Sequence, residues 1–131
     1  MSQNVPHDPH HEHLIKEIAE LFKPVLSKSP QAIYIYLDDT HKICNKKFAD
    51  LLGYKSIQEW VDYQTPVSDV DEKDQEKVIN AYMDASRNLK ASTVNVNVVK
   101  KSGEKMRVEV AMSPVSYKDE VFVIHFISPS K

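Results

Sequence analysis

The last third of the chain alternates apolar and polar residues, and this period restricts the possible folds more than any other feature of the sequence. In STVNVNVVK, Val94, Val96 and Val98 alternate with polar residues, and KMRVEVAMS (105–113) repeats the pattern. A period of two places successive side chains on opposite faces of a strand, so each segment predicts a half-buried strand. EVFVIHFI (120–127) is apolar on both faces, which predicts a strand in the centre of a sheet.

Two glycines mark corners of the predicted fold, and they are the only glycines in the 131 residues. Gly103 lies in KKSGEK, between the first two C-terminal strands, where a hairpin needs a residue with positive φ. Gly53 follows KKFADLL (46–52), whose apolar residues share one helical face. The preceding Asn45 can accept hydrogen bonds from free backbone amides. We therefore expect a short helix that begins after Asn45 and ends at Gly53.

The first half of the chain combines helical periodicity with two short strand signals. Apolar residues recur at helical spacing between His11 and Phe22, and Pro24 disfavours further helix, so this helix ends or kinks near Phe22. AIYIYL is rich in the isoleucine and tyrosine that favour strands. In chain order, the predicted elements are a helix over 11–22 with a short continuation, strands over 32–37 and 42–44, the Asn45 helix, a helical turn from Ser56, and a helix from Glu72 to Asn88.

The order of these elements predicts an α+β fold with a five-stranded antiparallel sheet. Short links between successive strands in each group favour antiparallel pairing. About forty residues of short helices separate the group of two strands from the group of three. These helices must fold over one face of the sheet, because the apolar face of a sheet needs a cover. The N-terminal helix is then available for the opposite face or for a partner protein.

Charge and cysteine content exclude several functional classes. A net charge of −2 gives no basic field that would attract nucleic acid or anionic lipid, so neither partner is expected. The apolar runs, such as AIYIYL and the VFVI before His125, are far below the roughly 18 residues of a membrane helix. The single cysteine, Cys44, excludes an intrachain disulfide and suits a reducing compartment, and the polar N-terminus does not resemble a signal peptide. These features predict a single soluble, cytoplasmic domain.

Four local motifs, in this order, resemble the PAS domain family. NKKFADLLGY (45–54) is similar to the family's asparagine, aromatic, paired-leucine and Gly-Tyr pattern, and DEKDQEKV (71–78) to the acidic start of its long helix. KKSGEK resembles the family's lysine-rich hairpin, and SPV (113–115) its link toward the last strand. With this resemblance, the chain divides into a flexible tail over 1–10, an N-terminal helix over 11–28 and a PAS-like domain over 29–128.

The resemblance implies a cavity between the sheet and the helices, and signalling through the N-terminal helix. We therefore expect a stand-alone sensory and signal-transduction module that binds a small molecule in this cavity, and not an enzyme. A ligand-free module for protein interaction and dimerisation is the alternative. The candidate cavity residues are Ile35, Phe48, Leu52, Tyr82, Val96, Val110, Ile124 and His125.

His125 is the only strongly polar residue in the last apolar strand. Imidazole can donate, accept and titrate near neutral pH, and the equivalent strand lines the cavity in the family that this chain resembles. A histidine that faces solvent, or one paired with a backbone carbonyl, is the simpler interpretation. The alternation alone does not tell which face carries the polar strand residues Asn95, Asn97, Arg107 and Glu109.

The apolar stripe of the N-terminal helix is the second predicted site. It can pack within this chain or pair with a second copy. Because the sequence ends three residues after position 128 and contains no output domain, we expect the signal to pass through a homodimer or a separate signalling protein. The predicted dimer residues are Leu14, Ile15, Ile18, Leu21 and Phe22.

Histidines and aspartates raise the question of metal binding. The N-terminal histidines can bind Zn, Cu or Ni, but a polar tail with incidental histidines is preferred, and no metal site is predicted. The acidic segment that starts at Asp69 lacks the turn glycine and the distal glutamate of a calcium loop. The histidines are His7, His10, His11 and His13, and the acidic residues are Asp69, Asp71 and Asp74.

Cofactor and enzyme alternatives are weaker still. Haem-binding members of the family carry a histidine on the long helix, and VINAYMDASRNL (78–89) has none. The flavin photoadduct requires a cysteine motif on the helices, whereas Cys44 falls on a predicted strand. An isomerase-like enzyme needs buried carboxylates, which the apolar strand faces lack. The cofactor, if the protein uses one, is left unknown.

Overall fold

The computed structural model describes residues 9–130 of the chain. Its elements are α1 (Pro9–Leu21), α2 (Lys23–Lys28), β1 (Ala32–Asp38), β2 (His41–Cys44), α3 (Lys46–Leu52), α4 (Ile57–Asp62), η1 (Pro66–Asp69), η2 (Glu72–Asp74), α5 (Gln75–Asn88), β3 (Ser92–Val99), β4 (Lys105–Tyr117) and β5 (Glu120–Pro129). The first helix starts at Pro9, two residues earlier than predicted, and proline suits this position because the first helical amides have no intrahelical partner. The rest of the predicted tail, residues 1–8, lies outside the described residues.

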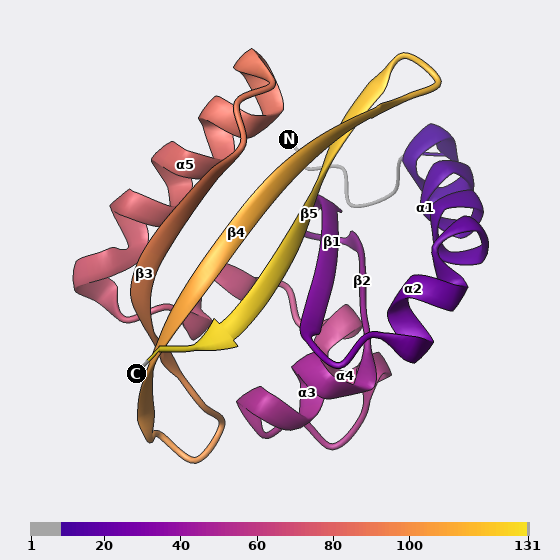
Figure 1. Cartoon of the computed structure of the whole chain (residues 1–131). Helices are drawn as coiled ribbons and strands as arrows, with labels where there is room; N and C mark the ends of the chain where they lie inside the picture. The colour runs from indigo at the N-terminus through magenta and orange to yellow at the C-terminus, as the bar shows by residue number, and fades with distance from the viewer. Residues whose placement is uncertain (1–8, 131) are drawn as a thin grey trace.

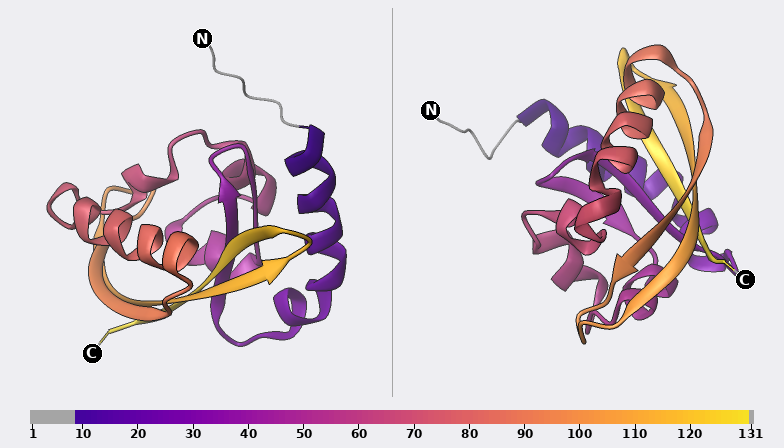
Figure 2. Two further views of the ribbon diagram at one scale, coloured as in Figure 1. Left: turned by 90° about the horizontal axis from the view of Figure 1, so that it is seen from above. Right: turned by 90° about the vertical axis from the view of Figure 1, so that its left-hand side faces the viewer.

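The five strands form one antiparallel sheet in the order β2-β1-β5-β4-β3. The expected α+β fold is therefore confirmed, and β5 lies in the centre, as its two apolar faces predicted. Figure 1 shows α5 on one side of the sheet and α1 and α2 on the other, and the view from above in Figure 2 agrees. Phe48 of α3 and Trp60 of α4 pack in the same core as Ala85 of α5. The sheet thus separates two cores.

Alternate residues of the central strands β1 and β5 supply these two cores. Ala32 of β1 and Val123 and Ile127 of β5 belong to the larger core beneath α3, α4 and α5. The residues between them face α1. Each large aliphatic side chain buried there contributes roughly 1.5–3 kcal/mol to the stability of the folded chain. The second core consists of Leu14, Ile18, Ile33, Ile35, Leu37, Phe122 and Ile124.

Local signals set the corners of the fold as predicted. The Asn45 side chain accepts a hydrogen bond from Phe48 N, and Gly53 ends α3 with a φ of 84°. Ser56 caps α4 by accepting from Glu59 N. Gly103, in the β3–β4 hairpin, has a φ of 92°. Both glycines thus adopt the left-handed conformation that other residues avoid.

Two boundaries differ from the prediction. The predicted helix from Glu72 is split into η2 and α5, and α5 starts at Gln75. Strand β4 does not end near Ser113 but continues to Tyr117. The strand can accommodate Pro114 because this residue lies beyond Met112, the last residue of β4 that pairs with β3, so that a missing amide can face a free edge. Lys118 and Asp119 then form the turn, with φ values of 49° and 65°. A turn with two positive φ angles usually contains glycine or asparagine, so Lys-Asp gave no signal.

Asn45 joins β1, β2 and α3 through a buried amide. Its Oδ1 accepts from Ile33 N at 3.1 Å and from Phe48 N at 3.0 Å, and its Nδ2 donates to Gln31 O at 2.9 Å. The residue is only 3% exposed. Water therefore does not replace these bonds when the amide is removed.

We expect Asn45→Ala to lower the free energy of unfolding by about 2–4 kcal/mol, because it removes a helix cap and leaves buried backbone groups unpaired. The control is Ser56→Ala, which removes the exposed cap of α4 and costs only about 0.5–1 kcal/mol. Urea denaturation of both variants measures the difference. Equal losses would contradict the role given to the buried amide.

Candidate functional site

A cavity of about 390 Å³ lies between the sheet and its helical cover. This volume is within the range of small-molecule sites, which is roughly 300–1,000 Å³. The exposed side chains of Val67 and Ile79 belong to its lining, so the cavity reaches the surface between η1 and α5. The sheet contributes Tyr34, Tyr36, Val96, Val98, Val110, His125 and Ile127, the β1–β2 turn contributes Asp39, and the cover contributes Phe48, Leu52, Trp60, Pro66, Val67, Asp69, Val70, Val78, Ile79, Tyr82 and Met83.

Six of the eight candidate cavity residues line this space, namely Phe48, Leu52, Tyr82, Val96, Val110 and His125. The other two candidates, Ile35 and Ile124, lie on the opposite face of the sheet and pack in the α1 core. Both strands are apolar on both faces, so periodicity did not identify which face borders the cavity. On β1, the side chains that line the cavity are the tyrosines and not the isoleucines.

An aromatic cluster forms the part of the cavity wall around His125. The rings of Tyr34 and His125 stack, with centroids 3.9 Å apart and planes within 10°. Tyr82 of α5 lies nearly parallel to His125, at 6.3 Å, and packs edge-on against Tyr36. Burial raises the pKa of Tyr34 and of Tyr82, so both phenols are uncharged at neutral pH. Tyr34 and Trp60 are the main cavity aromatics that the sequence analysis missed.

His125 is a buried, neutral imidazole. It is 2% exposed, and burial lowers its pKa to about 3, which the nearby backbone of Val123 and Tyr34 opposes only in part. Its Nδ1 has no partner at hydrogen-bonding geometry among residues 9–130. Buried polar atoms are usually paired, so this nitrogen is available to a polar group that enters the cavity.

Asp69 is one of two acidic residues in the described cavity lining, the other being Asp39. Tyr54 donates its hydroxyl to both carboxylate oxygens, at 2.8 and 2.9 Å. Burial raises the pKa of Asp69 to about 6, and the hydrogen bond from Tyr54 offsets only part of this effect. A carboxyl with this pKa changes charge just below neutral pH.

Lys42 holds the cover in place from behind the cavity wall. Its ammonium is buried and donates to the carbonyl oxygens of Asp39 at 2.6 Å, Val61 at 2.9 Å and Tyr63 at 2.6 Å. The same nitrogen lies 5.1 Å from the centre of the Trp60 ring, a favourable cation–π distance. Burial lowers the pKa of Lys42, although nearby carboxylates oppose this effect. The strand KIC gave no sign of this role.

The polar strand residues Asn95, Asn97, Arg107 and Glu109 are not part of the cavity lining. They alternate with Val96 and Val110, which do line it, so they belong to the outer face of β3 and β4. This result resolves the alternative that the sequence left open.

The predicted dimer residues divide into two sets. Leu14 and Ile18 are 1% and 0% exposed and pack in the core of this chain, so they are not available to a second copy in this arrangement. Phe22 packs partly against the same core, where its ring meets Phe122 edge-on at 5.8 Å. Ile15 is partly exposed and Leu21 is 57% exposed. Dimerisation itself stays a prediction.

The PAS domain profile matches residues 30–128, which is most of the chain. The chain belongs to the PAS domain family. Solved PAS domains share its fold: one from Colwellia psychrerythraea has a TM-score of 0.64 and 21% identity, and covers 89% of this chain and 97% of its own. The PAS domain of an HTR-like protein from Haloarcula marismortui has a TM-score of 0.62 and 17% identity, and covers 94% and 100%.

A PAS domain from a two-component sensor histidine kinase has a TM-score of 0.64 and 14% identity, with coverage of 88% and 99%. None of the curated proteins matches this PAS domain. PAS domains are typically sensory modules of signal transduction and generally not enzymes. Among residues 9–130, no helix of this PAS domain is both long and apolar enough to span a bilayer.

Asp69→Asn should change how the stability of the PAS domain depends on pH. The pKa of Asp69 is about 6 in the folded chain, against 3.8 for an unperturbed aspartate, so the folded state binds the proton more tightly than the unfolded state. Wild-type stability therefore falls as pH rises from about 4 to about 6, by about 1 kcal/mol once solvent screening is included. Asparagine does not ionise, so the variant should lack this fall. Urea denaturation across this pH range tests it, with exposed Asp84→Asn as a control that keeps the wild-type profile.

His125→Phe should have the opposite effect on acid stability. The folded pKa of about 3 lies below the reference of 6.5, so the unfolded state binds the proton first as pH falls. The wild-type chain should lose roughly 3 kcal/mol between pH 7 and pH 4 from this group. Phenylalanine keeps a ring against Tyr34 without titrating, so the variant should lose less. Equal losses in wild type and variant, measured by urea denaturation at both pH values, would count against a buried neutral imidazole.

Proposed function

We propose that this PAS domain is a sensory module that binds a small, uncharged and largely apolar molecule between its sheet and its helices. The observation that carries the proposal is a ligand-sized, aromatic cavity with a buried imidazole nitrogen that lacks a hydrogen-bond partner among residues 9–130. Small-molecule sites commonly combine an apolar lining with a few convergent polar groups. His125 and Asp69 are these groups here.

The lining favours an uncharged ligand. His125 is neutral, and the phenols of Tyr34 and Tyr82 are also neutral, so the aromatic part of the described wall offers no charge to an ion. The two carboxyls of the lining, Asp39 and Asp69, already accept hydrogen bonds from Tyr36 and Tyr54. A buried charge without a partner is strongly unfavourable. A flat ring that stacks on the aromatic wall and donates to or accepts from His125 matches the lining best.

Signalling can pass from the cavity through the sheet to α1. His125 and Ile124 are neighbours on β5, and they face the cavity and the α1 core respectively. A ligand that moves His125 therefore moves the strand on which Leu14 and Ile18 pack. Output by a homodimer through the N-terminal helix, or by a separate signalling protein, is part of the same proposal. With Leu14 and Ile18 buried, the exposed Leu21 and Val25 are the residues that such a contact would use.

A ligand-free interaction module is the second candidate. The outer face of β3 and β4 favours it, because exposed Thr93, Asn95, Arg107 and Glu109 leave this part of the sheet without a helical cover. In that case the aromatic side chains would only fill the core. The two functions differ in whether the cavity takes up an apolar probe.

Binding of the neutral fluorescent probe 1-aminoanthracene tests the proposal. We expect saturable binding of one probe per chain, and a melting temperature that rises with probe concentration. Val110→Phe fills the cavity and should weaken binding at least about tenfold, equivalent to about 1.4 kcal/mol. The matched control is Ala111→Phe, which adds the same ring to the outer face of β4 and should leave binding unchanged.

Native mass spectrometry of untagged protein provides a second readout, because a retained metabolite adds its mass to the chain. Failure of wild type to bind the probe, together with a bare chain in the mass spectrum, would favour the interaction module. Equal binding by Val110→Phe and wild type would show that the probe binds elsewhere.

A further inference from the structure

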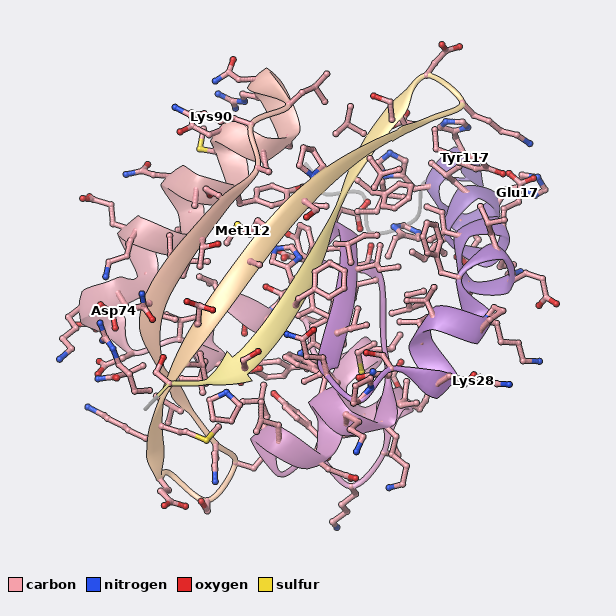
Figure 3. The ribbon with its side chains drawn as sticks, viewed as in Figure 1. Glu17, Lys28, Asp74, Lys90, Met112 and Tyr117 are labelled. Atoms are coloured by element: carbon pink, nitrogen blue, oxygen red, sulfur yellow. The ribbon has the colours of Figure 1, made fainter. Side chains whose placement is uncertain are left out.

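Three segments distant in sequence meet beside the first turn of α1. They are the start of α1, the turn between β1 and β2, and the turn between β4 and β5. Figure 3 shows Glu17 of α1 next to Tyr117 at the end of β4, and Lys118 binds Glu17 there at 2.9 Å. Histidines and carboxylates gather where these segments join.

His11, Asp38 and His41 form the centre of this cluster. His11 Nδ1 lies 2.7 Å from Asp38 Oδ2, and His41 Nδ1 lies 2.8 Å from Asp38 Oδ1. One ligand atom from each of the three residues lies within 4.8 Å of the others. The His41 side chain is only 4% exposed, and that of His11 is 22% exposed. These imidazoles are therefore part of the packed structure and not of a solvated tail.

Two more carboxylates surround the same imidazoles. Glu120 Oε1 lies 3.3 Å from His11 Nε2, and Glu12 Oε2 lies 3.6 Å from His41 Nε2. Three carboxylates thus face two imidazoles that are uncharged in their metal-binding form. A divalent cation would neutralise most of this negative charge at its centre.

The Asp38 carboxylate is held in a fixed orientation by the turn. Its Oδ1 accepts from Thr40 N at 2.9 Å, from Thr40 Oγ1 at 3.0 Å and from His41 N at 2.8 Å. Hydrogen bonds of this kind orient ligands in metal sites and raise their affinity.

We propose that His11, Asp38 and His41 bind a divalent transition-metal ion of the zinc type between the imidazole nitrogens that face Asp38, with Glu120 and Glu12 holding the opposite ring nitrogens. Two imidazoles and a carboxylate suit zinc and its neighbours, whereas magnesium and calcium prefer oxygen alone. Bonds of about 2.0–2.2 Å place ligand atoms roughly 3–3.5 Å apart around such an ion. Small side-chain rotations reach this geometry from the present distances.

The ion would fasten the first turn of α1 to the turn between β1 and β2. The same helix packs on β5 through Leu14 and Ile18, so metal occupancy would control how firmly α1 stays on the sheet. This site uses none of the residues that line the small-molecule cavity, although Asp39, next to Asp38, belongs to that lining. The sequence did not show it, because Asp38 and His41 are 27 and 30 residues away from His11 along the chain.

Isothermal titration of untagged, metal-free protein with ZnCl2 tests the site, with MgCl2 as the competing hard ion. We expect one zinc ion per chain and no response to magnesium. His11→Ala, Asp38→Asn and His41→Gln should each weaken zinc affinity by about 100-fold or more. His11 is partly exposed, so His11→Ala keeps the test valid where His41→Gln fails to fold.

The matched control is His13→Ala, which removes an exposed histidine two residues from His11 and should leave the zinc affinity unchanged. Hydrogen exchange gives a readout beyond binding: zinc should slow the amides of α1 in wild type and in His13→Ala, but not in His11→Ala. Absence of saturable zinc binding by wild type would overturn the proposal. So would loss of binding in His13→Ala with retention in His11→Ala, since exposed histidines would then be the ligands.

Discussion

The whole domain depends on two central strands that bury side chains on both faces. β1 and β5 pair so that Tyr34 lies opposite His125 and Ile35 opposite Ile124. Successive side chains alternate, so one pair faces the cavity and the other faces α1. A slip of one residue would exchange the two sets and place the imidazole against the helix. The register, both cores and the aromatic wall of the cavity are therefore fixed by one constraint.

This constraint also explains how two sites on opposite faces can influence one another. Tyr34 and His125 stack at 3.9 Å on one face, and the adjacent residues carry the packing of Ile18 on the other. A change in the packing of these rings can affect α1 without touching it, because the rings and the residues under α1 share the backbone of the same two strands. The histidine–carboxylate cluster joins α1 to the ends of β1 and β5, so it would act on the same helix from its first turn.

The sequence predicted the helices and strands more accurately than it predicted which face of each strand borders the cavity. Polar alternation around Val96 and Val110 identified β3 and β4 but not which face borders the cavity, and the caps at Asn45 and Gly53 followed from local chemistry. Ile35 was assigned to the cavity wrongly, because β1 is apolar on both faces and only its pairing and cover decide between them. Long-range contacts gave no signal at all: the roles of Lys42 and Asp38 depend on partners that only the fold brings near.

Polar contacts outside the cavity explain why its cover does not collapse onto the sheet. Lys42 ties β2 to the carbonyls of Val61 and Tyr63, and Asp74, labelled in Figure 3, accepts from Asn97 N at 2.8 Å and so fixes the start of α5 to β3. These bonds require specific distances, whereas apolar packing alone would favour closing the space. The cover is thus positioned by the chain itself. A ligand that enters a pre-formed space orders little of the protein, so more of its contact energy remains as affinity.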